Sequence, residues 1–362
     1  MNTPPSHDES PERLLAIRKM REQTYLPDEQ APYHGVSHPD VVWEKAKLLI
    51  DRCKQLGIAV DTKSLHDAIE LHDALSHVDP KLLGFSSSEH LAATLTERFL
   101  VSVGHSQETA HTVGSIVMAT NPDVRPRTPE EIIIRAADIW NIGNDYKEFV
   151  DATRSLHQEA MNRRQEEIPF KSFLVGSYGY LQKFLWPMLE LTDTARDSEG
   201  RSVWHVNALR NLSQQWRDTF GDETPVVAEL FPTGAISPYP ATQPHTFYIA
   251  MHPDEEHRKD ALEITRNSIK GCNGAAFVIP STESAFSLPD NTCTSVILHE
   301  PSPASVREAL RVAKNGGAIM LPMRSNLDPS ICEIAQSLRS VTIAPREEGL
   351  PATLVIFKEL VS

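Results

Sequence analysis

Two histidines and two aspartates in the first half of the chain have the residue types of a metal-binding set. They are His38, the adjacent pair His72-Asp73, and Asp138. Two imidazoles and two carboxylates suit a divalent ion of hard to borderline character, which turns bound water into a nucleophile near neutral pH. These residues therefore predict a metal-dependent hydrolase.

The helices expected around these residues direct them inward. In a helix expected over 62–76, His72 shares one face with Leu65 and Ile69, because residues three and four apart lie on the same side. Asp138 lies on the apolar face of a helix expected over 128–142. A carboxylate there has a large desolvation cost unless a cation or a hydrogen-bond network compensates it. A bound metal ion would supply that cation.

The remaining candidate, His38, stands beside Pro39 at the start of a helix expected over 39–56, where its ring can turn inward. A second His-Asp dipeptide, His66-Asp67, falls on the flank of the apolar face and is the poorer ligand candidate. A lone inward histidine is usually a satisfied core residue, and a lone buried aspartate is usually a cap or an ion-pair partner. The conjunction of all four residues favours a metal site over these alternatives.

Composition and length narrow the class of protein. The 362 residues suggest two domains. The net charge of -14 argues against passive binding to nucleic acid or anionic membranes, which needs clustered Lys and Arg. The four cysteines show no CxxC spacing, and neither a signal peptide nor a membrane-spanning run is recognisable. We expect a cytoplasmic protein with thiols rather than disulfides.

The periodicity of apolar residues changes along the chain. Residues 1–165 have the three-and-four spacing of helices, and 166–220 are helical and rich in aromatic residues, which predicts a connector. Residues 221–362 alternate short β-like runs with helical ones, such as 255–269 and 305–314, and end in an expected antiparallel hairpin. The predicted fold is an all-α bundle followed by an α/β, Rossmann-like domain.

Several short motifs of the first half resemble the HD-domain metal-dependent phosphohydrolases, over roughly 33–158. The motifs are Tyr33-His34-Gly35-Val36-Ser37-His38, Glu70-Leu71-His72-Asp73-Ala74, Ser88-Glu89-His90, Ile116-Val117-Met118-Ala119-Thr120 and Ala136-Ala137-Asp138-Ile139-Trp140-Asn141-Ile142-Gly143. The resemblance implies an all-helical HD-type bundle that binds Mn, Fe, Co, Mg or Zn. It implies His38, His72, Asp73 and Asp138 as the ligands.

Catalytic roles follow from the same resemblance. Asp73 is the carboxylate that such proteins use to bridge or orient the metal water, and His34 and Glu89 are candidates for proton transfer or for support of the ligands. An exposed loop histidine is the alternative for His34, and a charge at a helix N-terminus is the alternative for Glu89. Asn121 follows Ala119-Thr120 where the subgroup often has a further histidine, so a second metal ion is less expected.

Four arginines are candidates for phosphate binding, but solvated surface charge is the favoured interpretation for each. They are Arg125, Arg127, Arg135 and Arg154.

The second half resembles the class I S-adenosylmethionine-dependent methyltransferase fold over about 219–361. Three departures from that pattern predict a degenerate domain, which we expect not to bind the cofactor. The first-strand loop Phe231-Pro232-Thr233 is followed by a single glycine, His252 replaces the acid that holds the ribose, and Thr294 replaces the aspartate near the fourth strand. We expect a scaffold, dimerisation or regulatory role for this half.

The functional prediction is a metal-dependent phosphohydrolase for a small phosphorylated metabolite or nucleotide, in a chain that can form a homo-oligomer. Two alternatives stay open. One is a non-catalytic ligand-binding or assembly protein built from two enzyme-derived domains. The other, less favoured, is an S-adenosylmethionine-dependent methyltransferase.

Overall fold

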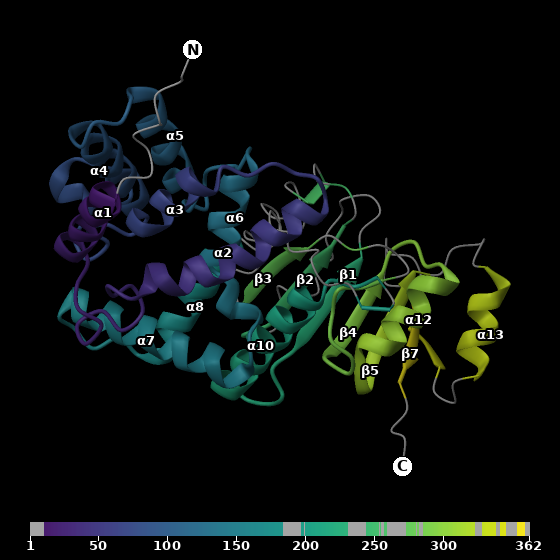
Figure 1. Cartoon of the computed structure of the whole chain (residues 1–362). Helices are drawn as coiled ribbons and strands as arrows, with labels where there is room; N and C mark the ends of the chain where they lie inside the picture. The colour runs from purple at the N-terminus through teal and green to yellow at the C-terminus, as the bar shows by residue number, and fades with distance from the viewer. Residues whose placement is uncertain are drawn as a thin grey trace. The chain divides into compact units, whose positions relative to one another are not determined.

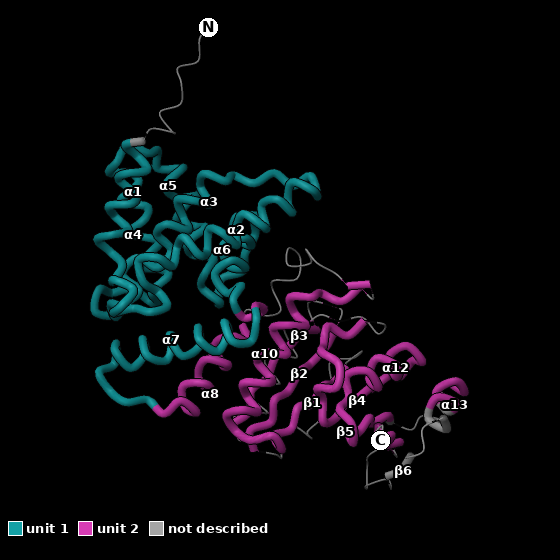
Figure 2. Tube along the Cα trace, turned by 60° about the horizontal axis from the view of Figure 1, so that its bottom comes forward, with its two compact units in different colours: residues 1–141, 145–168, 190–194 teal, residues 142–144, 169–189, 195–362 magenta. Residues whose placement is uncertain are grey.

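The chain forms two compact units, shown in different colours in Figure 2. Unit 1 comprises residues 1–141, 145–168 and 190–194, and unit 2 comprises 142–144, 169–189 and 195–362. The computed structural model describes residues 11–183, 197–198, 200–230, 244–252, 254, 257–258, 273–279, 281, 285–322, 328–337, 341–344 and 353–358. Among these residues, no helix has both the length and the apolar character needed to cross a bilayer.

In its described part, unit 1 contains helices and no strand (Figure 1). The helices are α1 (Pro11–Thr24), α2 (His38–Gln55), α3 (Thr62–Leu71), η2 (Pro80–Leu83), α4 (Ser88–Ser102), α5 (Gln107–Met118), α6 (Pro129–Asp138) and α7 (Tyr146–Arg164). Helices α2, α3 and α6 pack against one another, and their ends hold the four candidate ligands.

Local sequence sets where these helices begin. Asp61 caps α3 by accepting hydrogen bonds from the backbone N–H groups of Lys63 and Ser64, both at 3.1 Å. Thr128 and Glu131 form a capping box at the start of α6. Helix α2 begins at His38, one residue before the position predicted for it, with Pro39 in its first turn.

Two helix ends differ from the prediction. Helix α3 ends at Leu71 rather than near 76, because the backbone turns away and Leu75 adopts a left-handed φ of 61° while its N–H donates to the Thr24 carbonyl. Helix α6 ends at Asp138 rather than at 142, and a short 3-10 helix, η3 (Trp140–Gly143), follows. The candidate ligands therefore lie at or just beyond helix ends.

Unit 2 contains a seven-stranded sheet with the order β3-β2-β1-β4-β5-β7-β6. The strands are β1 (Val226–Leu230), β2 (Phe247–Met251), β3 (Ala275–Ile279), β4 (Cys293–Leu298), β5 (Ala313–Pro322), β6 (Val341–Ala344) and β7 (Thr353–Phe357). The first five are parallel, and β7 runs antiparallel to both of its neighbours. This is the Rossmann-like α/β domain with a closing hairpin that the sequence predicts.

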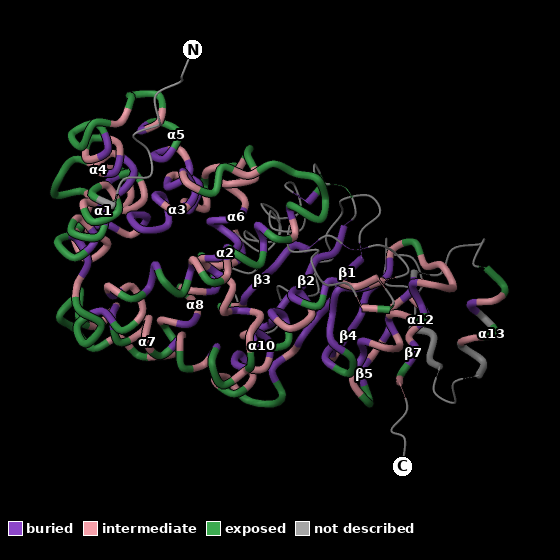
Figure 3. Tube along the Cα trace, in the orientation of Figure 1, coloured by how far each residue is buried: buried purple, intermediate pink, exposed green. Residues whose placement is uncertain are grey.

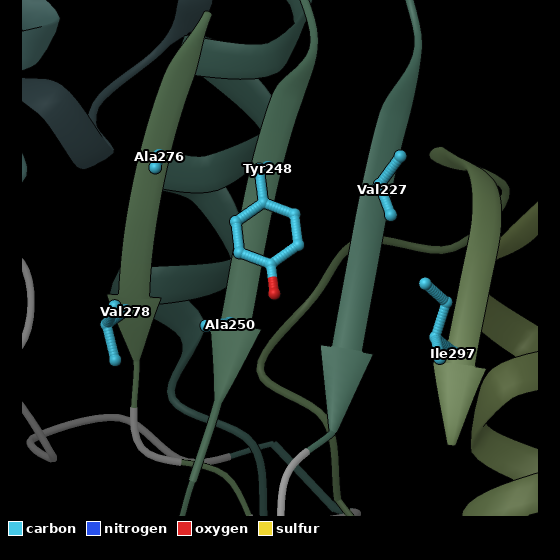
Figure 4. Close-up of a cluster of buried hydrophobic side chains, with 6 residues drawn as sticks. All are labelled: Val227, Tyr248, Ala250, Ala276, Val278 and Ile297. Carbon is cyan, nitrogen blue, oxygen red and sulfur yellow. The ribbon is translucent and has the colours of Figure 1, made fainter. Parts of the chain in front are cut away.

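The central strands are fully buried, which explains their continuous apolar sequences (Figure 3). On one face of the sheet, buried side chains from β1 to β4 form a cluster (Figure 4). Its members are Val227, Tyr248, Ala250, Ala276, Val278 and Ile297. The Tyr248 hydroxyl is the polar group of this cluster, and it donates a hydrogen bond of 2.7 Å to Glu229.

The segment predicted as a connector, 166–220, belongs to unit 2 from residue 169 onward, apart from 190–194, which are assigned to unit 1. Its helices α8 (Phe170–Leu181) and α10 (Val203–Phe220) pack through aromatic side chains, with Tyr178 stacked on Trp216 at 5.2 Å between ring centroids and close to Phe277 of β3. The aromatic residues thus build the core of the α/β unit. The unit also contains α12 (Pro303–Val312) and α13 (Pro329–Ser337).

Two predicted features lie outside the described residues. One is the first-strand loop at 231–234. The other is the helix expected over 255–269, of which only 257–258 are described, and these two residues are helical.

Candidate metal centre

The four predicted ligands converge in unit 1, with one ligand atom from each lying within 4.8 Å of all the others. The Nε2 atom of His38 is 3.1 Å from Asp138 Oδ1 and 3.6 Å from Asp73 Oδ2. The Nε2 atom of His72 is 3.2 Å from Asp73 Oδ2 and 3.5 Å from Asp138 Oδ1. Ligands about 2.1 Å from a tetrahedral ion would be about 3.4 Å apart, so these spacings fit one divalent ion.

Hydrogen bonding prepares His72 to act as a ligand. Its Nδ1 lies 2.8 Å from the Ile69 carbonyl, and the hydrogen bond there places the proton on Nδ1, so that the Nε2 lone pair is directed at the two carboxylates. His72 Nε2 and Asp73 Oδ2 are buried and have no hydrogen-bond partner among the described residues. Buried polar atoms normally have a partner, so a cation is the group that this arrangement lacks.

The electrostatics of the centre favour a bound positive charge. Burial alone would raise the pKa of Asp73, but His72 and His34 lower it to about 2. Burial alone would lower the pKa of His72, but Asp73 and Asp138 raise it well above 6.5. In the metal-free protein a proton on His72 therefore neutralises part of the carboxylate charge, and an ion would replace that proton.

Asp73 is also positioned through its backbone. Its N–H donates to the hydroxyl of Tyr25 at 2.9 Å, and this tyrosine, at the end of the first helix, is buried. Burial and the charge of Asp73 raise the pKa of Tyr25 well above 10, so the hydroxyl stays neutral. The sequence analysis missed Tyr25, because 48 residues separate it from Asp73.

His34 lies beside the centre without being one of the four ligands. Its ring centroid is 5.5 Å from that of His38, and its Nδ1 is 2.8 Å from Glu159 Oε1 of α7. The other Glu159 oxygen accepts the backbone N–H of His34 at 3.1 Å. Burial alone would lower the pKa of His34, but Asp73 and Glu159 raise it above 6.5. Glu159 is a second residue that the sequence analysis missed.

Glu89 is not part of the four-residue group. It lies in the first turn of α4, where its carboxylate accepts a hydrogen bond of 3.3 Å from Asn121 Nδ2, and Ser87 accepts another from the same amide. The helix N-terminal role considered for Glu89 agrees with this position.

The second His-Asp dipeptide has a structural role. Asp67 is buried and accepts two hydrogen bonds, of 2.6 and 2.5 Å, from one guanidinium nitrogen of Arg13 in α1. The His66 ring contacts Trp43 edge-on at 4.7 Å. Its rank below His72-Asp73 as a ligand candidate agrees with this geometry.

One of the arginines predicted to be solvated is buried. Arg135 donates to the carbonyls of Ala119 at 2.7 Å, Asn121 at 2.6 Å and Val124 at 2.5 Å, and so it holds the turn after α5. The prediction of surface charge was wrong for Arg135, because the backbone carbonyls of that turn need donors. The other three arginines, Arg125, Arg127 and Arg154, are exposed.

Two of the three predicted departures from the methyltransferase pattern lie on described residues of unit 2, at opposite edges of the sheet. His252 follows β2 at the carboxyl edge of the sheet, where it is buried, and its Nδ1 accepts the N–H of Asp254 at 3.0 Å. Thr294 lies at the opposite, amino end of β4, where it bonds both backbone groups of Val226. Its assignment to the cofactor pocket was therefore wrong, since ligands of such sheets bind at the carboxyl edge.

Sequence analysis also missed a carboxylate at that carboxyl edge. Glu229 of β1 is fully buried and accepts hydrogen bonds from Tyr248, at 2.7 Å, and from His299 Nε2, at 2.5 Å. The signal that could have identified it is that Glu229 is the one charged residue in an otherwise apolar strand.

No protein-family model matches this chain, and no curated protein is significantly similar to it in sequence. Solved structures similar to it include a putative S-adenosyl-L-methionine-dependent methyltransferase from Methanococcus maripaludis, with 15% identity and a TM-score of 0.31, covering 42% of this chain and 85% of that one. Another is an rRNA methylase from Streptococcus thermophilus, with 12% identity and a TM-score of 0.30, covering 42% of this chain and 96% of that one.

A third similar structure is a putative precorrin-6Y C5,15-methyltransferase domain from Corynebacterium diphtheriae, with 13% identity and a TM-score of 0.31, covering 41% of this chain and 96% of that one. Likeness at this level assigns no activity to this chain. The description of unit 2 as Rossmann-like rests on its own strand order.

Proposed function

We propose that this chain is a metal-dependent phosphohydrolase of the HD type that acts on a small phosphorylated metabolite or nucleotide. The observation that supports this most directly is the group of four ligand atoms within 4.8 Å of one another. Two of these atoms are buried and have no hydrogen-bond partner in the part of the chain that the structure describes. A divalent ion bound there would activate water and polarise a phosphoryl oxygen.

His34 is the proposed proton donor to the leaving group. Its side chain is partly exposed, lies next to His38 and is held by Glu159, which fixes the orientation of the ring. The raised pKa keeps a larger fraction of the imidazole protonated at neutral pH than an isolated histidine would have. Asp73, a proposed ligand, also orients the attacking water, and Tyr25 holds the Asp73 backbone in place.

Unit 2 is proposed to be a non-catalytic accessory domain. An imidazole, His252, stands where a carboxylate would hold the ribose hydroxyls of S-adenosylmethionine. The nearby Asp254 carboxylate is already bonded to the backbone N–H and the ring of His257, at 3.1 and 3.0 Å. These residues do not fit the ribose contact of that cofactor.

A methyltransferase is the second candidate function. The sheet order and the buried Glu229 at the carboxyl edge of β1 favour it. Titration of the whole protein with S-adenosylmethionine decides between the two roles of unit 2, because saturable binding would revive methyl transfer and make the accessory role untenable.

The proposed hydrolase is tested by a screen of phosphomonoesters, nucleotides and cyclic nucleotides in the presence of Mn²⁺, with His72→Ala as the inactive variant. We expect hydrolysis by the natural protein that falls by several orders of magnitude in the variant. Hydrolysis that is absent throughout, or that is unchanged by His72→Ala, would sink the proposal and leave the non-catalytic binding protein as the alternative.

A further inference from the structure

A buried histidine at the carboxyl edge of the sheet in unit 2 has a hydrogen-bond donor without an acceptor. His252 directly follows β2, is 3% exposed, and donates its backbone N–H to the Ile279 carbonyl of β3 at 3.1 Å. Its Nδ1 accepts the backbone N–H of Asp254 at 3.0 Å, so the ring proton is on Nε2. This buried Nε2–H has no partner among the described residues. Buried polar groups normally have one, so a bound acceptor is the group that this arrangement lacks.

Arg258 brings a positive charge to the same residue. It is also buried, and its Nη1 donates to the His252 carbonyl at 2.9 Å. The backbone N–H of Arg258 donates to the Asp254 carbonyl at 3.1 Å, so the chain from 252 to 258 folds back and holds the guanidinium next to the histidine. A guanidinium has five donors in a planar fork, which several acceptors can share. A neutral N–H donor and a cation are therefore held together at the end of β2.

Two carboxylates near this edge accept hydrogen bonds from other residues. Asp254 accepts the backbone N–H of His257 at 3.1 Å, and its carboxylate is 3.0 Å from the Nδ1 atom of the same residue. One oxygen of Glu229 in β1 accepts from Tyr248, and its other oxygen lies against an imidazole beyond β4. In the described part of the chain, neither carboxylate is hydrogen-bonded to His252 Nε2. Neither one therefore supplies the missing acceptor.

The position of these donors indicates the kind of ligand that they would bind. The strand order changes direction between β1 and β4, and sheets of this kind bind ligands in the crevice outside the carboxyl ends of the strands. In dinucleotide-binding sheets an acidic side chain bonds the ribose hydroxyls there, whereas an arginine accommodates a phosphate on the ribose. His252 and Arg258 fit the phosphate, because both donate hydrogen bonds and the guanidinium adds a positive charge.

We propose that His252 and Arg258 bind a phosphate group on the ribose of a nucleotide ligand of unit 2. The inference goes beyond the proposed phosphohydrolase, which concerns unit 1, and does not depend on it. Nucleotides with a 2′- or 3′-phosphate are then the preferred ligands, and the same nucleosides with the phosphate elsewhere or without it bind weakly. S-adenosylmethionine, whose ribose carries no phosphate, belongs to the weak group.

The test is calorimetric binding of matched probes to the full chain. The probes are the 2′-, 3′- and 5′-monophosphates of adenosine and of cytidine, together with the two nucleosides. EDTA is present throughout, so that no divalent ion in unit 1 binds the phosphate. We expect a 2′- or 3′-monophosphate to bind about tenfold more tightly than the 5′-monophosphate and the nucleoside, since hydrogen bonds to a charged group are the stronger ones.

Variants locate the preference in unit 2. His252→Leu removes the donor and Arg258→Gln removes the charge, and each is expected to abolish the preference. His252→Gln keeps an N–H near the position of Nε2 and should retain part of it. Arg210→Gln is the matched control and should leave the preference unchanged, because Arg210 is exposed on α10 and donates to Asn207 at 2.8 Å. Thermal unfolding followed by circular dichroism shows which variants are folded.

Equal affinities for all probes, binding of none of them, or a preference that survives in folded His252→Leu or Arg258→Gln would overturn the proposal. The comparison of probes on the natural protein decides the question even where a variant does not fold. Hydrolysis of phosphomonoesters with Mn²⁺ reports separately on unit 1. The preference without hydrolysis refutes only the phosphohydrolase, and hydrolysis without the preference refutes only the phosphate site of unit 2.

Discussion

At the scale of single residues, the chemistry of the centre depends on where protons and lone pairs lie. His72 donates its Nδ1 proton to a backbone carbonyl and directs Nε2 at Asp73 and Asp138. In the metal-free protein a proton on Nε2 lies between the imidazole and these carboxylates, and a bound ion would replace it. A set of four ligand atoms held in this way binds an ion with little reorganisation, which favours high affinity.

Removal of one carboxylate should therefore weaken metal binding strongly. We expect Asp138→Asn to lower Mn²⁺ affinity by roughly 100-fold or more, which is at least the effect usual for the outer partners of metal ligands. Competition titration with a fluorescent chelator measures the change. Asp51→Asn is the control, because Asp51 is exposed on α2 and pairs only with Lys54 in the described structure. Equal affinity of the two variants would contradict the ligand assignment.

The pH dependence of hydrolysis should depend on Glu159. The pKa of His34 is raised, so its proton is present below that raised value and is lost as the pH rises through it, which produces the alkaline limb of the rate profile. Glu159→Gln removes one of the charges that raise this pKa, so we expect the limb to move to lower pH. The kcat profile measures the shift, with Glu148→Gln, exposed on the same helix, as the control. An unmoved limb would exclude His34 as the group responsible.

At the scale of secondary-structure elements, two His-Asp dipeptides on one stretch of chain have separate roles. His72-Asp73 lies just beyond the end of α3, whereas Asp67 lies inside α3 and pairs with Arg13 of α1 in the interior. Breaking a buried pair by removing one partner leaves an uncompensated charge.

Asp67→Ala should thus destabilise the fold without changing the metal centre. We expect a loss of roughly 3–5 kcal/mol in the free energy of unfolding, measured by urea denaturation of the metal-free protein. Asp51→Ala is the exposed control, with an expected change below about 0.5 kcal/mol. If Asp67→Ala reduced Mn²⁺ affinity as much as Asp138→Asn did, the division of roles between the two dipeptides would be wrong.

The elements also show which parts of the structure the sequence can predict. Helix starts were predictable within a residue or two, because caps such as Asp61 and Thr128 are local signals. The ends of α3 and α6 were not predictable to the same precision. The end of α3 depends on a hydrogen bond from Leu75 to Thr24, about fifty residues back in the chain. The buried strands were found from their continuous apolar runs.

The candidate site shows the same division between local and distant information. The four convergent residues could be chosen from their types and from the faces of the expected helices. Glu159 and Tyr25 could not, because they reach the centre from 125 and 48 residues away and have no distinctive motif. Glu89 was chosen from a motif alone, and in the structure its carboxylate accepts a hydrogen bond from Asn121.

At the scale of the whole molecule, the two compact units are not consecutive segments of the chain. Residues 142–144 follow the proposed ligand Asp138 closely but belong to unit 2, where Asn211 donates to the carbonyls of Ile142 and Asn144 at 2.8 and 2.9 Å. The division predicted at 220/221 from the change in periodicity misses this exchange, because periodicity reports local structure and not which parts pack together.

The whole chain should not bind S-adenosylmethionine with useful affinity. We expect no saturable heat in calorimetry at millimolar cofactor, because His252 replaces the ribose-binding acid and Asp254 is engaged by His257. Binding of the cofactor in the micromolar range, abolished by Glu229→Gln, would instead establish unit 2 as a ligand-binding domain.

The most direct test of the proposed centre is anomalous diffraction from crystals soaked in Mn²⁺, with data collected at the manganese edge. If the four side chains bind one ion, the anomalous map has one strong peak about 2.0–2.3 Å from the ligand atoms of His38, His72, Asp73 and Asp138. A peak elsewhere, or no peak among these four side chains at saturating Mn²⁺, would contradict this assignment.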